Sequence, residues 1–171
     1  SRTRLDMDGI GERWENYTRL AGEIAVAARN KVNPDAFVAG GIAPSTGGNT
    51  PSKHKDSPTT ISHEMLEQSE VLKEAGVDFM LPEYVGGIDD CVAAVDACAK
   101  VGLPVFLGIK HVSTYLKDPV PLIQALKGHQ VDGILCMCSP PSDISDRIPI
   151  LRDAFDGTIG GYANIGYSKW P

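Results

Sequence analysis

The sequence contains few cysteines and few aromatic residues. Four of its 171 residues are cysteine, and Phe, Trp and Tyr together make up 6%. Small secreted domains that depend on disulfides are far denser in cysteine, which argues against a disulfide scaffold. The aromatic residues form no array on which nucleobases would stack. We therefore expect free thiols and a reducing, cytoplasmic compartment.

The chain also lacks long apolar runs and an excess of positive charge. No segment approaches the roughly 18 apolar residues of a membrane-spanning helix, and the N-terminal segment has no apolar signal core. The formal net charge is −6, with acidic and basic residues mixed along the chain. Nucleic-acid-binding proteins carry a basic patch or stripe instead. Neither a membrane nor a nucleic acid is expected as a partner.

What the sequence does contain is one unit that recurs along a single domain, residues 1–171. Short apolar runs alternate with helical patterns, and several runs are apolar throughout, as buried parallel strands are. Glycine follows three of the helices, where a left-handed residue is favoured. The expected strands cover residues 36–44, 77–84, 104–110, 131–138 and 157–166, the helices residues 11–30, 63–76, 88–102, 119–130 and 143–155, and the glycines are Gly76, Gly102 and Gly128.

Serial βα units fit either an open doubly wound sheet or a (β/α)8 TIM barrel. No dinucleotide-binding glycine motif follows the first strand, and no P-loop is present. Polar residues instead end the later strands, at Glu83, Lys110, Cys138 and Asn164. A barrel places its chemistry at that rim. We predict an α/β fold of the barrel type that is partial, because five strands cannot close an eight-stranded ring.

The polar segment over residues 45–63 is rich in Gly, Pro, Ser and Thr. This composition predicts a mobile loop after the first strand. The cysteines fall into two pairs. Cys91 and Cys98 are seven residues apart in a helical pattern, so both are expected to face the sheet. Cys136 and Cys138 are two apart at a strand end, where alternation predicts a shared face.

Five segments resemble, in order, the strands of a known enzyme family. They read "FVAGGIAP", "LKEAGVDFMLPEY", "VGLPVFLGIK", "VDGILCMCSPPSDI" and "GGYANIG". Together they resemble strands three to seven of the homocysteine S-methyltransferase family, whose fold is a (β/α)8 barrel. The resemblance implies a central fragment of such a barrel, with the first two strands and the last one missing.

The resemblance also implies an activity and a metal. The family transfers a methyl group from a small-molecule donor to the thiol of homocysteine, which gives methionine. A free thiol is mostly protonated at neutral pH, and a zinc-bound thiol is deprotonated. The family binds zinc through three cysteines, of which Cys138 matches one. The other two are expected in a C-terminal part that these 171 residues lack, so the piece alone is expected to be incomplete.

Two further residues match substrate-binding positions of the family. Glu83 matches a glutamate that holds the amino end of homocysteine, and Asn164 matches an asparagine of the rim. Two neighbours depart from the family pattern, because Tyr84 replaces threonine and Met137 replaces asparagine. The resemblance does not identify the methyl donor.

Other interpretations remain open at this point. Lys110 ends a strand at the rim, where a lysine with a lowered pKa can form a Schiff base in an aldolase or lyase. Cys136 is either a core residue or a substitute metal ligand. The chain is also compatible with an inactive barrel fragment. Exposed sheet edges would then favour a homo-oligomer or aggregation.

Overall fold

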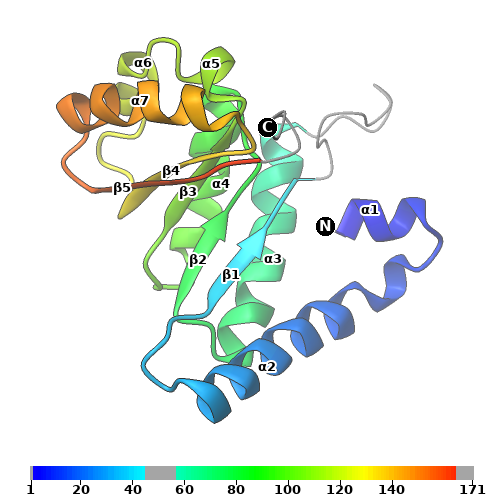
Figure 1. Ribbon diagram of the computed structural model, residues 1–171. Helices are drawn as coiled ribbons and strands as arrows, with labels where there is room; N and C mark the ends of the chain where they lie inside the picture. Colours follow the sequence, from blue (N-terminus) through cyan, green and yellow to red (C-terminus); the bar gives the residue numbers. More distant parts are fainter. Residues whose placement is uncertain (1, 45–56, 165–171) are drawn as a thin grey trace, which may run out of the picture.

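Five short parallel strands lie side by side in the order in which they occur in the chain. The computed structural model describes residues 2–44 and 57–164 (Figure 1). The β1 strand pairs with β2, and β3 pairs with β4, which pairs with β5. Isolated bridges from Met80 to Val105 and from Val85 to Ile109 join β2 to β3. The strands are β1 (Ala39–Ile42), β2 (Phe79–Pro82), β3 (Phe106–Lys110), β4 (Gly133–Met137) and β5 (Thr158–Tyr162). The predicted α/β fold with parallel strands is confirmed.

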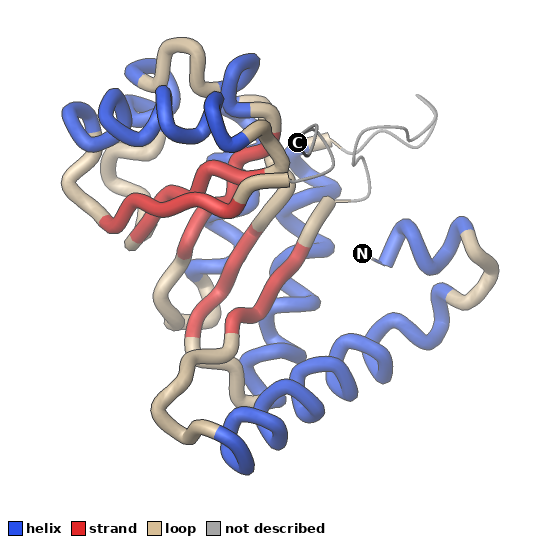
Figure 2. The backbone as a smooth tube through the Cα atoms, viewed as in Figure 1, coloured by secondary structure: helices blue, strands red, loops and turns tan. Residues whose placement is uncertain are grey.

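Helices follow the strands and cover one face of the sheet (Figure 2). Figure 1 shows α3 and α4 behind the first strands and α5, α6 and α7 beside the last ones. No helix within the described ranges combines the length and the apolar character needed to cross a membrane. The helices are α1 (Arg2–Met7), the 3-10 turn η1 (Gly11–Arg13), α2 (Trp14–Val32), α3 (Pro58–Ala75), α4 (Ile88–Ala99), α5 (Val112–Tyr115), α6 (Val120–Ala125) and α7 (Pro141–Ala154).

Local sequence signals explain where α3 begins and ends. The Ser57 hydroxyl accepts a hydrogen bond from the Thr60 amide at 3.1 Å, and Pro58 occupies the first turn. Gly76 ends the helix with a φ of 92°, and Gly102 and Gly128 also have positive φ, as predicted. The loop expected over residues 45–63 therefore gives way to helix from residue 58 on, and residues 45–56 lie outside the described ranges.

The core lies between the sheet and the covering helices. Cys91 and Cys98 of α4 are fully buried there, as the helical spacing predicted. Burial raises the pKa of Cys91 to about 12 and that of Cys98 to about 11. Leu107 and Ile109 of β3, which belong to the same core cluster, are also 0% exposed. Each such aliphatic side chain contributes about 1.5 to 3 kcal/mol on burial.

The opposite face of the sheet carries no covering helix in the described part of the chain. Phe79 and Phe106 lie there as an edge-to-face pair, with ring centroids 5.0 Å apart. Within the described residues, β1 and β5 are the end strands, and neither pairs with a further strand. Such edges offer unpaired backbone groups. Self-association through them stays a prediction.

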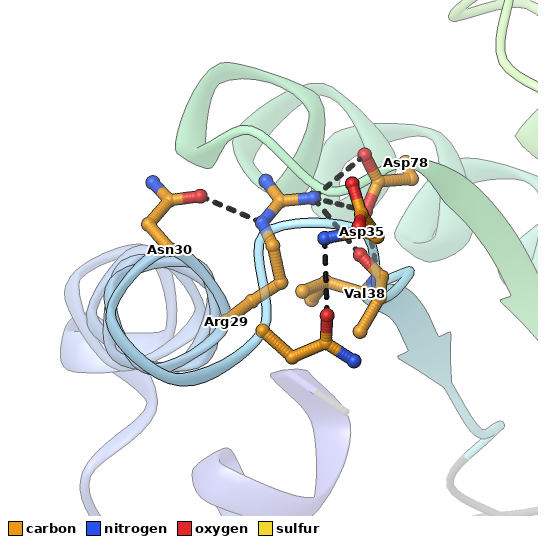
Figure 3. A network of polar contacts seen from close by, with 7 residues as sticks. Arg29, Asn30, Asp35, Val38 and Asp78 are labelled. Carbon is orange, nitrogen blue, oxygen red and sulfur yellow. Dashed lines mark hydrogen bonds and ion pairs between the residues drawn. The ribbon is translucent and has the colours of Figure 1, made fainter.

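A polar network fastens the end of α2 to the start of the sheet (Figure 3). The Asp78 carboxylate accepts hydrogen bonds from the Val38 amide at 2.6 Å and from Arg29 Nη1 at 2.9 Å. Arg29 also donates to the Ala36 carbonyl at 3.3 Å and to Asn30 Oδ1 at 2.7 Å. Asp78 thus fixes both the entry into β1 and the helix before it.

We predict that Asp78 makes stability sensitive to acid. The Val38 hydrogen bond and then Arg29 lower the Asp78 pKa, so the stabilisation is present above the unfolded value near 3.9 and is lost as pH falls through the folded value. Asp78→Asn should lower the free energy of unfolding by about 1 to 3 kcal/mol at pH 7. In urea titrations, this deficit should shrink below about pH 4.

Asp35→Asn is the matched control, because Asp35 lies in the loop between α2 and β1 that Asp78 contacts, and its own side chain is exposed. It should change stability by less than about 0.5 kcal/mol. A deficit for Asp78→Asn that stays constant down to low pH would contradict the role of the charge.

Candidate functional site

Four polar residues predicted to share a rim lie at the carboxyl ends of neighbouring strands. Lys110 closes β3, Glu83 and Cys138 directly follow β2 and β4, and Asn164 lies two residues after the end of β5. Cys138 interacts electrostatically with both Glu83 and Lys110, which brings these three together. The Asn164 amide donates to the Ser139 carbonyl at 3.1 Å, beside Cys138. The structure therefore gathers all four at one end of the sheet.

An extra residue in the chain after β2 aims Glu83 at this rim. Five residue steps separate Met80 from Val85, whereas four separate their bridge partners Val105 and Ile109. This mismatch is a bulge, a feature that often re-aims a side chain near a functional site. Tyr84 takes a φ of 63° within it, a conformation that is rare for a bulky residue.

Glycine at position 108 makes room for Glu83. A Cβ added to Gly108 would lie 3.0 Å from Glu83 Cβ and 3.1 Å from Glu83 Cα. Such contacts are closer than packed carbon atoms normally approach. Because residue 108 of β3 is glycine, Glu83 can lie across the face of the sheet that no helix covers.

Tyr162 holds the Glu83 carboxylate in place. Its hydroxyl donates to Glu83 Oε2 at 2.7 Å and lies 3.2 Å from Met137 Sδ. The Tyr84 amide also donates to Met137 Sδ, at 3.0 Å. Burial and the Glu83 charge raise the Tyr162 pKa, so the hydroxyl keeps its proton.

Sequence reasoning missed Tyr162, although a signal was present. Tyr162 lies opposite Met137 in the β4–β5 register. Directly opposite residues of parallel strands point to the same face. Met137 lies one position before Cys138. Its partner on β5, Tyr162, therefore lies close to the rim as well.

Cys136 of β4 and Cys138, which follows this strand, lie in different surroundings. Cys136 is 0% exposed and belongs to the same core cluster as Ile144 of α7, and burial raises its pKa to about 11. Cys138 is partly exposed at the rim, where burial and Glu83 raise its pKa and Lys110 opposes them. The predicted shared face is wrong, because Cys138 has a φ of 45° and alternation stops at the last residue of the strand.

Lys110 leans over an aromatic ring rather than toward a carboxylate. Its Nζ lies 4.5 Å from the centroid of the Tyr84 ring, within the range of a cation–π contact. The ion pairs of the described residues do not include it. Burial lowers its pKa, and the charges of Asp90 and Cys138 oppose this shift.

The rim does not hold a complete zinc site in the described ranges. No group of three His, Cys, Asp or Glu side chains in these ranges is arranged to bind a metal ion. A catalytic zinc requires three protein ligands. Cys138 offers one sulfur donor of the type that zinc binds. The described residues therefore include a suitable ligand but too few ligands for a zinc site.

The sequence is similar to one protein family over almost its whole length. The family model described as homocysteine S-methyltransferase matches residues 1–170. The S-methylmethionine–homocysteine S-methyltransferase BHMT2 of Mus musculus is 29% identical over 140 residues, which cover 78% of this chain and 36% of that protein. BHMT2 of Pongo abelii is 28% identical over 153 residues, which cover 85% of this chain and 40% of that protein.

Solved structures share the fold at lower identity. The homocysteine methyltransferase MmuM from Escherichia coli in its metallated form gives a TM-score of 0.80 at 18% identity, covering 96% of this chain and 63% of that one. Its oxidized form gives a TM-score of 0.81 and the same 63% coverage. The chain therefore spans well under half the length of the curated relatives it matches and somewhat less than two thirds of MmuM.

Proposed function

The chain belongs to the homocysteine S-methyltransferase family, and we propose that it is part of an enzyme that transfers a methyl group to the thiol of homocysteine, giving methionine. The observation that carries this proposal is the Glu83 carboxylate, fixed by Tyr162 at the carboxyl end of the sheet, within a chain that the family model matches over residues 1–170. The other substrate is a small-molecule methyl donor.

We propose that the sheet is part of a (β/α)8 barrel completed by further strands. Its parallel strands follow chain order, and its helices cover one face, as they do in a barrel. The uncovered face would then line the barrel interior. The length of the relatives supports this interpretation, since the match covers 36% of one and 40% of the other.

In this proposal Glu83 binds the ammonium group of homocysteine. Tyr162 occupies Oε2, and Oε1 lies beside Gly41, where an added Cβ would come within 3.5 Å. With no side chain on that glycine, an ammonium group can approach Oε1 and form a charge-assisted hydrogen bond. Asn164, partly buried beside Ser139, offers a further polar contact to the substrate.

We propose Cys138 as one metal ligand of the complete site. Support comes from the match to a zinc-binding cysteine and from the placement of this thiol at the rim with Glu83. The described residues supply too few donors for zinc, so no step of the transfer is assigned to the metal. What these residues do is orient the substrate, and methyl transfer by displacement depends strongly on such alignment.

The proposal predicts that Glu83 recognises the amino group of homocysteine. Calorimetric titration of the chain with L-homocysteine should show binding that Glu83→Gln weakens about tenfold or more, since a hydrogen bond to a charged group contributes about 1.5 to 3 kcal/mol. The same titration with 4-mercaptobutanoate, which lacks the amino group, should not distinguish the variant from the parent chain.

Glu23→Gln provides the control, because Glu23 is an exposed glutamate of α2, a helix that contributes no residue to the rim. It should leave both affinities unchanged. Equal losses for both ligands in Glu83→Gln would point to a general disturbance and would sink the proposed contact.

The lyase interpretation of Lys110 has one supporting observation, the burial that lowers its pKa. A Schiff base needs the neutral amine, which such a shift favours. Borohydride treatment with a carbonyl substrate separates the two functions, because a lyase traps the substrate on Lys110 and a methyltransferase does not.

A further inference from the structure

A small cavity lies beside the rim, between the turn that follows β2 and the end of β3. It encloses about 230 Å³, and its lining includes Pro44, Tyr84, Val85, Asp90, Lys110 and Tyr115. Neither Glu83 nor Cys138 belongs to its lining. The cavity is thus a separate space from the proposed homocysteine contact, although Lys110 borders both.

Two tyrosines and two apolar residues form the walls. Tyr115 packs against the backbone of Gly86, where an added Cβ would lie 2.6 Å from the ring, so the ring can approach this closely only because residue 86 is glycine. Tyr84 presents its ring under the Lys110 ammonium. Pro44 and Val85 add apolar surface. These side chains can contact the flat or compact body of a ligand, while the rest of the lining is polar.

Lys110 supplies the positive charge of this cavity. Its ammonium is partly buried and contacts the Tyr84 ring, and the ion pairs of the described residues do not include it. A partly desolvated ammonium gains more from a carboxylate than from a ring alone, because hydrogen bonds between charged groups are the stronger ones.

Asp90 sets a limit on the charge of the ligand. Its carboxylate borders the cavity and lies close to Gly87, where an added Cβ would come within 3.5 Å of Oδ2. It also interacts electrostatically with Lys110. A ligand with a second negative group would meet this carboxylate and be repelled.

We propose that this cavity binds a small monocarboxylate with an apolar body, whose carboxylate pairs with Lys110 while the body lies between Tyr84 and Tyr115. The site lies beside the proposed homocysteine contact but does not include Glu83. It follows from the tyrosine walls, the Lys110 ammonium and the opposing carboxylate of Asp90 among the described lining residues.

Benzoate is the probe, and the chemical shifts of the Gly86 and Gly87 amides report its binding in an NMR titration of the 171-residue chain. Benzoate should shift both amides saturably, whereas the uncharged isostere benzamide should bind about tenfold more weakly or worse. Terephthalate, with its second carboxylate, should also bind more weakly than benzoate.

Three variants separate a built site from general attraction. Lys110→Met should weaken benzoate binding about tenfold or more, and Lys110→Arg should retain most of it because the charge remains. Lys117→Met removes an exposed lysine from the loop after α5 and should change nothing. Benzamide binding as tightly as benzoate, terephthalate matching benzoate, or equal losses in the two Met variants would each overturn the proposal.

Discussion

Iodoacetamide should alkylate the folded chain at Cys138 alone. The other three cysteines are fully buried, and burial raises their pKa values to about 11 or 12. They can react only when the surrounding structure opens, which costs several kcal/mol for core elements. We expect Cys138 to react on the order of 10³-fold faster than the buried thiols, as measured by mass spectrometry over time.

The Cys138→Ser variant provides the decisive comparison. It should show no labelling on the time scale of the parent chain, and three labelled thiols after unfolding in urea, against four for the parent. Prompt labelling of Cys136 in the folded chain would mean that Cys136 and Cys138 share the rim after all. That outcome would reopen Cys136 as a candidate metal ligand.

Replacing Ile109 with alanine should lower the free energy of unfolding by about 2 to 5 kcal/mol. Ile109 is 0% exposed in the middle of the sheet and belongs to the core beneath the helices. Removing its outer carbon atoms leaves a cavity that the neighbouring strands cannot fill without disturbing their hydrogen bonds to β3. Urea unfolding followed by circular dichroism measures the loss.

Ile24→Ala tests whether the loss comes from burial. Ile24 of α2 is 60% exposed, so the identical chemical change should cost less than about 0.5 kcal/mol. Similar losses at the two positions would show that the face of β3 toward the helices is not the core of this molecule.

Much of the fold could be predicted from the periodicity of the sequence. Each expected strand contains an observed strand, because continuous apolar runs are typical of buried parallel strands. The glycines predicted after the helices have positive φ, and Cys91 and Cys98 are buried as their spacing indicated. These features depend on residues close together in the sequence, which is why local patterns were sufficient.

Boundaries were less predictable where neighbouring elements decide them. The α3 helix begins at Pro58, five residues before the expected start at residue 63, because Ser57 caps it. The α6 helix covers only Val120–Ala125 of the residues expected over 119–130. His129, which lies beyond the end of this helix, contacts Asp96 of α4 at 2.5 Å.

The rim was also predictable only in part. That the strand ends gather Glu83, Lys110 and Cys138 follows from parallel strands alone. The bulge at Tyr84 and the left-handed residue at Cys138 do not, because both depend on the register with the next strand. Alternation counted along β4 therefore misplaced one cysteine, and Tyr162 was overlooked. The binding roles of Glu83 and Asn164 and the metal role of Cys138 stay predictions.

The strands lie in the sheet in the same order as in the chain, and this order affects how such a protein folds during synthesis. Each strand lies beside the one synthesised just before it, through ladders or, between β2 and β3, through isolated bridges, so every new βα unit can dock onto an edge that already exists. Growth from a ribosome then needs no rearrangement of earlier contacts, and the separation between contacting segments stays short. The positive-φ glycines at 76, 102 and 128 lie at the joints between these units, which makes them natural boundaries for exchanging whole units between related chains.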